Sequence, residues 1–498
     1  MRPDIDRLER EDLAMFVNAC FACSGQAEFY ADSRGQDVAI QFLHEYILGN
    51  YRRLYARTLA AGINHFNQSL IIANLLAQGA PKREADRDEE GALLSEALRR
   101  LPASRSWRLV ASLRERGVNN RRTRAIVREF FELRRDVTHD AVKYRPRVKV
   151  AARHAHCPLP GELAPFLFAN TRRRKVAFST PIFEAHRRAR TEPEALYELP
   201  YTVAEGFAAR HRIPRDEFLQ RIEARMTPAE RLRLQSTARA EGASISLDLH
   251  RIDLTRLCLY VLSLPVEERL ARAAALNAAL ATSADRVVRR APMRLGRVAA
   301  VLDRSHSSGG SHEKARRPLA VALGVAQLLE ASASEFRAFW TPPLEDPLTL
   351  EAAGQTDLAT PLVDALATAP DLVVIVSDGF ENSPRGGVAE VMRHYRQRVA
   401  PTHRVSVVHV NPVFDQERFA PRALAPGVAT VGLRDADDLF TMLGFARFAE
   451  GSGTLAELEA WLLARVKRFL AVRAQREEIF EHTDTSATDD SDEAVEAR

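Results

Sequence analysis

The sequence predicts a multidomain protein in which an all-α N-terminal half precedes a doubly wound α/β domain. From residue 12 to about residue 281, apolar residues recur at three- and four-residue spacing, which is the period of an α-helix. After residue 297, short unbroken apolar runs alternate with amphipathic segments, as in a parallel sheet covered by helices on both faces. The 498 residues, 46% of them apolar, suffice for two to four domains.

Six breaks divide the N-terminal half into helices of moderate length. Most contain proline or glycine, which end helices, and they lie at Gly79-Ala80-Pro81, Leu101-Pro102, Gly117-Val118-Asn119-Asn120, Cys157-Pro158-Leu159-Pro160, Ile213-Pro214 and Leu264-Pro265. Short turns at this spacing favour a helical-repeat array of stacked helix pairs, similar to HEAT-like repeats, over a compact bundle. The irregular helix lengths fit an open solenoid and a closed, ring-like array equally well.

Three apolar runs in the second half have the length and composition of buried parallel strands. They are Val298–Leu302, Leu372–Val376 and Val405–Val410. Helices are predicted between them at Pro318–Ala331, Leu358–Ala367 and Val388–Val399. Two further helices, Ala436–Leu443 and Leu455–Val472, follow the third strand, and we expect both to cover the sheet.

Polar residues stand where the predicted strands end, which is where ligands bind in open α/β sheets. Ser305, Ser307 and Thr356 offer hydroxyl oxygens, and Asp303 and Asp378 offer carboxylates. Mg²⁺ prefers oxygen ligands and retains several waters, which the two carboxylates can hold by hydrogen bonds. The sequence therefore predicts a divalent-cation site, with Mg²⁺ the expected ion.

These motifs resemble the metal-ion-dependent adhesion site of von Willebrand factor A domains. The family pattern is Asp-x-Ser-x-Ser after the first strand, Gly-x-Thr before a helix and Asp-Gly after a central strand, and all three occur here in order between residues 294 and 473. The resemblance implies that the cation binds an acidic group of a protein partner. The loop departs from the family at Arg304 and His306, whose basic side chains would either compete with a cation or attract an anionic ligand.

Catalysis is the weaker interpretation of this loop. His306 and His312 lie close in sequence to serines, so a Ser/His nucleophile is conceivable. However, the sequence contains neither a nucleophile elbow nor a third acid to orient the histidine. We therefore predict a binding protein and not an enzyme.

Charge is distributed unevenly along the chain. Residues 99–190 hold 24 Lys and Arg against 7 Asp and Glu, although the whole chain carries only +5. Such a block indicates a polyanion partner, usually nucleic acid, although a solvated helix face in an arginine-rich chain has the same composition. Residues 477–498 hold nine acidic residues against one basic residue and few apolar ones, so we expect an acidic disordered tail.

Within the basic block, Arg and Lys are interleaved with Tyr and His. This mixture binds phosphates and stacks on unpaired bases, while the plainer alternative is a set of helix ends with a solvated basic face. The predicted RNA-binding residues are Arg121, Arg122, Arg124, Lys143, Tyr144, Arg145, Arg147, Lys149, Arg153, His154 and His156.

The whole chain resembles the Ro ribonucleoprotein family, in which a helical TROVE module precedes an A domain. The resemblance rests on Arg121-Arg122-Thr123-Arg124 before an aromatic helix, Val142-Lys143-Tyr144, Arg153-His154-Ala155-His156 and Gly354-Gln355-Thr356-Asp357, while the usual TROVE tryptophans are missing. It implies a TROVE-like domain at residues 1–290 that binds small structured or misfolded RNA. The alternative is a protein-only adaptor whose two halves bind protein partners such as an AAA+ ATPase complex.

The remaining features point to a cytosolic protein without a membrane partner. No apolar stretch reaches the length of a membrane span, and the first residues are too charged for a secretory signal. Four cysteines form no disulfide framework, so reduced thiols are expected. Cys20 and Cys23 form a Cys-x-x-Cys pair without a second pair at zinc-ribbon spacing, which makes a zinc or redox role the weaker interpretation.

Overall fold

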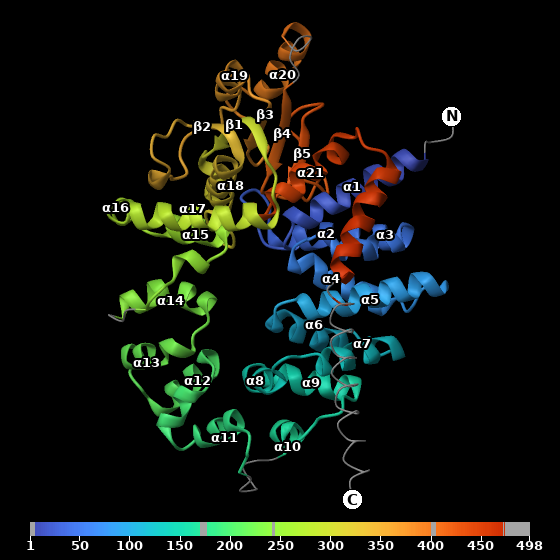
Figure 1. Ribbon diagram of the computed structural model, residues 1–498, viewed down its shortest axis with the longest axis vertical. Helices are drawn as coiled ribbons and strands as arrows, with labels where there is room; N and C mark the ends of the chain where they lie inside the picture. Colours follow the sequence, from blue (N-terminus) through green and yellow to red (C-terminus); the bar gives the residue numbers. More distant parts are fainter. Residues whose placement is uncertain (1–4, 170–176, 242–244, 400–404, 472, 474–498) are drawn as a thin grey trace, which may run out of the picture. The chain divides into compact units, whose positions relative to one another are not determined.

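A computed structural model describes residues 5–169, 177–241, 245–399, 405–471 and 473 (Figure 1). The chain forms two compact units, each built from two separate stretches of sequence. The sheet unit contains Met1–Glu45 and Ala177–Thr454, and the helical unit contains Tyr46–Val176 and Leu455–Arg498. The boundary between the two units therefore does not coincide with the boundary between the helical half and the sheet. Helices of the N-terminal half belong to both units.

Five parallel strands form the sheet in the order β2-β1-β3-β4-β5. The strands are β1 (Leu295–Asp303), β2 (Ala333–Thr341), β3 (Leu372–Val376), β4 (Ser406–Asn411) and β5 (Ala429–Gly432). The prediction of a parallel α/β sheet is confirmed, and β1, β3 and β4 coincide with the three apolar runs. The sequence did not indicate β2 and β5.

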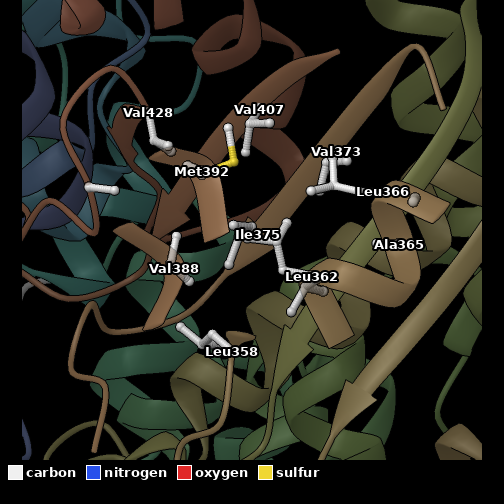
Figure 2. Close-up of a cluster of buried hydrophobic side chains, with 13 residues drawn as sticks. Leu358, Leu362, Ala365, Leu366, Val373, Ile375, Val388, Met392, Val407 and Val428 are labelled. Carbon is white, nitrogen blue, oxygen red and sulfur yellow. The ribbon is translucent and has the colours of Figure 1, made fainter. Parts of the chain in front are cut away.

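Side chains alternate between the two faces of the sheet, and helices cover both. On one face, Val373 and Ile375 of β3 pack against Leu362 of α19 (Ala359–Ala367) and Met392 of α20 (Gly387–Arg398), as Figure 2 shows. The opposite face packs against α18 (Arg317–Ser332), which contacts β1 and β2. Burial on both faces explains why the central strands are apolar throughout.

A side chain of the first helix of the chain forms hydrogen bonds with the backbone of the edge strand β5. Helix α1 (Ile5–Ala22) packs against β5 and against α21 (Leu439–Glu450). The Asn18 side chain donates to Thr430 O (2.8 Å) and accepts from Gly432 N. An amide side chain thus satisfies backbone groups that an edge strand otherwise leaves unpaired.

The sheet unit also contains the helices between residue 177 and the sheet. They are α11 (Pro181–Arg188), α12 (Tyr201–His211), α13 (Arg215–Ile222), α14 (Pro228–Ala240), α15 (Leu254–Ser263), α16 (Val266–Ala271) and α17 (Ala273–Arg290). Helices α15 and α17 pack on α18. Asp437 accepts hydrogen bonds from the backbone N and the hydroxyl of Thr255, at 3.1 and 2.8 Å, which fixes the start of α15 to the loop before α21.

The helical unit is an array in which helices pack on helices further along the chain. Helix α2 (Ser33–Asn50) runs across the unit boundary, and α3 (Arg52–Arg57), α4 (His65–Ala77), α5 (Glu84–Arg100), α6 (Ala103–Glu115), α7 (Arg121–Glu132), α8 (Val137–Lys143), α9 (Arg145–Ala155) and α10 (Leu163–Phe168) follow. Helix α4 packs on α6, α5 on α7, and both α6 and α7 on α9. The six predicted breaks all fall between helices.

The last helix, residues 455–471, corrects one prediction. We expected it to cover the sheet, but it belongs to the helical unit. There Arg100 donates to Phe469 O (2.7 Å), and the Arg100 guanidinium lies over the Phe469 ring at 4.1 Å. Its apolar face fits a helical array as well as a sheet, so amphipathicity alone did not identify its packing partner. The predicted acidic tail, residues 477–498, lies outside the described residues.

Candidate cation site and nucleic-acid interface

The predicted cation residues lie at the point where the strand order of the sheet reverses. With the order β2-β1-β3-β4-β5, the chain passes from β1 outward in one direction and from β3 outward in the other. Asp303 ends β1, and Asp378 follows β3 by two residues. The loops after two such strands separate and leave a crevice, which is the usual ligand site of doubly wound sheets.

Four of the five predicted cation residues converge there. Ser305 N donates to an oxygen of Asp303 (2.8 Å), and the hydroxyl oxygens of Ser305 and Ser307 are 3.3 Å apart. Burial raises the pKa of Asp378, and the neighbouring Ser307 side chain lowers it. None of these four residues is more than 5% exposed. The arrangement holds two carboxylates and two hydroxyls within one small, water-poor volume.

The fifth residue, Thr356, is buried in an adjoining loop that is tied to the other two. Thr356 N donates to Asn382 Oδ1 (2.9 Å), which connects this loop to the one after β3. Gly354 O accepts from His306 N (3.2 Å), which connects it to the loop after β1. The three loops are therefore linked to one another by hydrogen bonds.

The electrostatics of the two aspartates fit a bound cation. The pKa of Asp303 is raised to about 7, mainly because the carboxyl is buried and secondly because the Asp378 carboxylate is near. Burial also raises the pKa of Asp378. The Oδ2 atom of each is buried without a hydrogen-bond partner. Two such oxygens are unfavourable unless a positive group or its bound water meets them. Among the described residues, no cluster of three or more His, Cys, Asp or Glu is placed to hold a metal.

Arg304 does not point at the aspartates. Its guanidinium donates to Pro342 O (2.9 Å), Glu351 O (2.9 Å) and Pro343 O (3.3 Å), all in the loops that follow β2. The His306 side chain is exposed. Of the two alternatives for these basic residues, competition with a cation is not supported for Arg304, because backbone carbonyls already hold its side chain.

Tyr30 is a residue of the site that the sequence did not indicate. Burial, and after it the nearby Asp378 carboxylate, raises the pKa of the Tyr30 hydroxyl, while the neighbouring Ser307 side chain lowers it. The Tyr30 ring lies 4.7 Å from that of Phe380, over which the Arg422 guanidinium lies at 4.1 Å. A cavity of about 230 Å³ beside Asp378 is lined by these aromatic and basic side chains and by acidic ones, among them Asp415, which pairs with Arg422 (2.7 Å). A ligand at the cation would therefore meet a ring and a guanidinium as well.

A buried ion pair fixes the turn that carries Tyr30. Glu28 and Lys314, both less than 10% exposed, are hydrogen-bonded to each other. In addition, Ser311 donates to Ala27 O (2.7 Å). The N-terminal segment is thus attached to the loop that follows the serines of the cation site. Nothing local in residues 24–31 signals this contact, since the partner groups lie nearly 300 residues away.

In the helical unit, helix α9 presents three of the predicted RNA-binding side chains in one row. Arg145, Lys149 and Arg153 are four residues apart, so they share a face. Their cationic groups lie 5.1 Å from the Phe166 ring, and 5.5 and 4.8 Å from the Phe168 ring, respectively. We call this row the α9 ridge. The two phenylalanines, from α10, were not predicted as site residues, although their position beside a basic helix could have indicated them.

Comparison with solved structures finds a similar fold. The crystal structure of the Deinococcus radiodurans RO (RSR) protein matches with a TM-score of 0.50 and 16% sequence identity, covering 82% of this chain and 93% of that one. The chain has a Ro-like fold. At this identity the match shows the fold alone. Neither protein-family models nor curated protein sequences match the chain.

Several predicted RNA-binding residues of this Ro-like fold make internal contacts, among them Arg145, which donates to Phe166 O (2.7 Å). Two of them, Arg122 and His154, are held by buried groups. The guanidinium of Arg122 is bonded to Glu90 (2.5 Å), which is only 3% exposed. The His154 ring is buried and bonded to Val118 O (2.8 Å). Both side chains stabilise the helical unit, so we correct the prediction and remove them from the interface.

The other predicted RNA-binding residues lie at helix ends or on exposed faces. Arg121 and His156 are exposed, while Arg124, Lys143, Tyr144 and Arg147 are half-buried. Lys143 ends α8 and Tyr144 caps α9, so both adjoin the α9 ridge. The structure thus places Lys143 to Arg153 together, and Arg121 and Arg124 on α7, which packs against α9.

The cysteines lie in apolar surroundings. Cys20 and Cys23 are both fully buried, and burial raises the pKa of both thiols, that of Cys23 to about 12. Among the described residues, no helix is both long and apolar enough to cross a bilayer.

Proposed function

We propose that the protein is a cytosolic RNA-binding scaffold and not an enzyme. The α9 ridge of the helical unit binds small structured or misfolded RNA, and the α/β domain is a von Willebrand factor A type domain that binds a protein partner through a divalent cation. The observation that carries the RNA assignment is the alignment of Arg145, Lys149 and Arg153 beside the rings of Phe166 and Phe168. The Ro-like fold supports it.

The α9 ridge suits single-stranded RNA for two reasons. Its cations neutralise phosphates, which supplies affinity without sequence preference. The half-buried Phe168 ring lies among these cations and offers a surface on which an unpaired base can stack, a contact worth about 1–3 kcal/mol per base. Together the two contacts select unpaired nucleotides over duplex RNA, whose bases are not free to stack.

At the cation site, Ser305, Ser307 and Thr356 would contribute hydroxyl oxygens, and Asp303 and Asp378 would hold bound waters. With few direct carboxylates, a bound Mg²⁺ keeps an electrophilic position for an acidic side chain of a protein partner. The orphaned Oδ2 atoms of both aspartates support this assignment.

RNA binding is tested with the purified full-length protein and a fluorescent 20-nucleotide oligouridylate. We expect the logarithm of the affinity to fall linearly with the logarithm of the salt concentration, by about 0.7 per phosphate contact. RNA that copurifies with the protein should be recovered and sequenced in parallel. Absence of both copurified RNA and oligonucleotide binding at low salt would favour the protein-only adaptor instead.

The cation is tested by titrating Mn²⁺ into the metal-free full-length protein and measuring bound Mn²⁺ by electron paramagnetic resonance. We expect one site, lost in the Ser305→Ala/Ser307→Ala double variant. Ser263→Ala/Ser332→Ala, which removes two hydroxyls elsewhere in the sheet unit, is the matched control. Equal Mn²⁺ binding by all three proteins would refute the assignment.

A further inference from the structure

Two fully buried polar side chains, His409 and Asn411, lie on strand β4. They are two residues apart in a strand, so they share a face of the sheet. A buried polar group is unfavourable unless it is hydrogen-bonded, and an apolar residue of similar size fills the same space without that requirement. The partners of these two side chains therefore indicate what the polar groups contribute.

The His409 ring joins the end of β3 to the edge strand β5. Its Nε2 lies 3.1 Å from Ser377 O, and its Nδ1 lies 3.2 Å from Thr430 Oγ1. A carbonyl oxygen only accepts hydrogen bonds, so Nε2 carries the proton and donates to Ser377, and Nδ1 accepts from the Thr430 hydroxyl. Burial lowers the pKa of His409 to about 4, which keeps the ring neutral at physiological pH. The ring therefore holds the peptide group that immediately precedes Asp378.

The Asn411 amide holds the next carbonyl of the same loop. Its Nδ2 donates to Asp378 O (3.0 Å) and to Arg422 O (3.1 Å), and its Oδ1 accepts from Val413 N (2.8 Å). Both amide hydrogens and the carbonyl oxygen are thus used. The loop lies close to this side chain, because a Cβ added at Gly379 would be 3.1 Å from Nδ2. Side chains of β4 therefore fix the peptide groups on both sides of Asp378.

The loop itself fixes one of the two carboxylate oxygens of Asp378. Phe380 N donates to Asp378 Oδ1 (3.0 Å), whereas Oδ2 is buried and has no hydrogen-bond partner among the described residues. The backbone is held on both sides and one carboxylate oxygen is bonded. Oδ2 is therefore the atom that is left to meet a cation or its bound water.

We propose that His409 and Asn411 are positioning residues of the candidate cation site, which fix Asp378 before a cation binds. The effect on the cation rests on the proposed function, whereas the restraint on the loop stands on the hydrogen bonds alone. Groups that orient metal-binding residues typically contribute about 10- to 100-fold to metal affinity. A merely structural role, in which the two side chains satisfy carbonyls beyond the end of β3, would lower stability without a selective effect on the cation.

The first test separates the two hydrogen bonds of His409. The amide of His409→Gln reaches about as far as Nε2 and can still donate to Ser377 O, whereas the shorter amide of His409→Asn replaces Nδ1 and keeps only the Thr430 contact. Each variant retains one bond, so both should unfold at a similarly lowered urea concentration. In the Mn²⁺ titration of the full-length protein, His409→Gln should bind within about twofold of wild type and His409→Asn about tenfold more weakly or worse. Equal Mn²⁺ affinities of the two variants would overturn the proposal.

The second test compares two buried asparagines of the sheet unit. Asn411→Leu removes the amide that holds Asp378 O, and Asn18→Leu removes an amide that bonds two backbone groups of β5. Both variants should be less stable than wild type, but only Asn411→Leu should weaken Mn²⁺ binding, again by about tenfold or more. Binding that is weakened equally in both variants, or in neither, contradicts the assignment. If a leucine variant does not fold, the two His409 variants decide the question.

The third measurement needs no metal. In the metal-free full-length protein, hydrogen exchange of the Phe380 amide reports its bond to Asp378 Oδ1. We expect this amide to exchange about tenfold faster in His409→Asn and Asn411→Leu than in wild type, which corresponds to the loss of about one hydrogen bond. In His409→Gln and Asn18→Leu the rate should stay near that of wild type, and one common rate in all four variants would refute the positioning role. If wild type binds no Mn²⁺ but the exchange rates follow this pattern, the proposed function of the cation site fails and the positioning of Asp378 by β4 stands.

Discussion

The candidate cation site and the α9 ridge differ in how far their charged groups are exposed to solvent. At the cation site, Asp303 and Asp378 are almost fully buried, and each has an oxygen without a hydrogen-bond partner. On α9, the cations of Lys149 and Arg153 are partly or fully exposed and lie beside a phenylalanine ring. A buried carboxylate oxygen without a partner is unfavourable, whereas an exposed cation is solvated and contributes only a little to stability. Removing a ligand or a charge should therefore affect folding at the first site and binding at the second.

The largest expected effect is the pH dependence of the sheet unit without metal. The pKa of Asp303 is raised from 3.8 to about 7, so its protonated form is favoured in the folded state. In a chelator, the free energy of unfolding should be highest below about pH 4 and fall as the pH rises to about 7, by roughly 4 kcal/mol at most. Hydrogen exchange of β1 and β3 peptides measures the change for this unit alone.

Two controls sharpen this prediction. Asp303→Asn, which cannot ionise, should abolish the decline between pH 4 and pH 7. Saturating Mg²⁺ should oppose the decline because a ligand that binds only the folded state stabilises it, by about 2.7 kcal/mol at a hundredfold excess over Kd. A decline of the same size in Asp303→Asn would show that another group is responsible.

The next largest effect concerns basic side chains that are paired with a buried carboxylate inside the helical unit. Glu90 is 3% exposed and bonds Arg52 at 2.9 Å and Arg122 at 2.5 Å. Glu90→Ala leaves two guanidinium groups without their carboxylate, which should destabilise the helical unit by about 3 kcal/mol. Glu84→Ala on the same helix removes a partner of Arg87 that is 83% exposed, so it should change stability by less than about 0.5 kcal/mol. Urea unfolding of both variants separates the two outcomes.

The two sites also differ in how far the sequence revealed them. Strands β1, β3 and β4 were predicted because burial on both faces makes them continuously apolar. Strand β2 lies at one edge of the sheet and most of its residues are partly or fully exposed, so it lacks that signal. Strand β5 has only four residues. The cation loops were predictable because parallel strands end at one edge, which converts sequence order into proximity.

Contacts between distant segments could not be predicted in this way. Tyr30 lies on the segment that the Glu28–Lys314 ion pair attaches to the loop after the serines, and no local pattern encodes that pair. In the helical unit, Arg121 and Arg122 are consecutive, so the same residue types surround both in the sequence. Only the packing of α7 on α5 brings Arg122 to a buried carboxylate and leaves its neighbour exposed. The residue types therefore predicted a basic interface. Tertiary packing determines which of these basic side chains remain exposed.

Removing charge from α9 should weaken RNA binding and leave folding unchanged. The triple variant Arg147→Gln, Lys149→Gln, Arg153→Gln should lower oligouridylate affinity about tenfold or more at 50 mM salt and reduce the slope of its salt dependence by about 2. The matched control is Lys82→Gln, Arg83→Gln, Arg87→Gln, which removes three exposed charges from the same unit. Equal slopes for both variants would place the RNA elsewhere.

The smallest effect separates folding from binding at a single residue. His156 caps α9 with φ of 51° and ψ of 49°, a left-handed conformation that favours glycine. His156→Gly should therefore stabilise the helical unit by up to about 1 kcal/mol. The histidine ring is exposed beside the α9 ridge, so its loss should weaken oligouridylate binding about fivefold if it stacks on a base.

If His156→Gly raises the stability of the helical unit and lowers its affinity for oligouridylate, His156 belongs to the interface. A merely structural residue would change both quantities in the same direction. Thermal unfolding gives the first quantity and fluorescence anisotropy the second. His154→Gly, two positions earlier, is the contrasting variant. It removes a buried ring bonded to Val118 O and places glycine inside a helix, so stability and affinity should fall together. If His156→Gly instead raises stability with unchanged affinity, the interface on α9 ends before the cap, at Arg153.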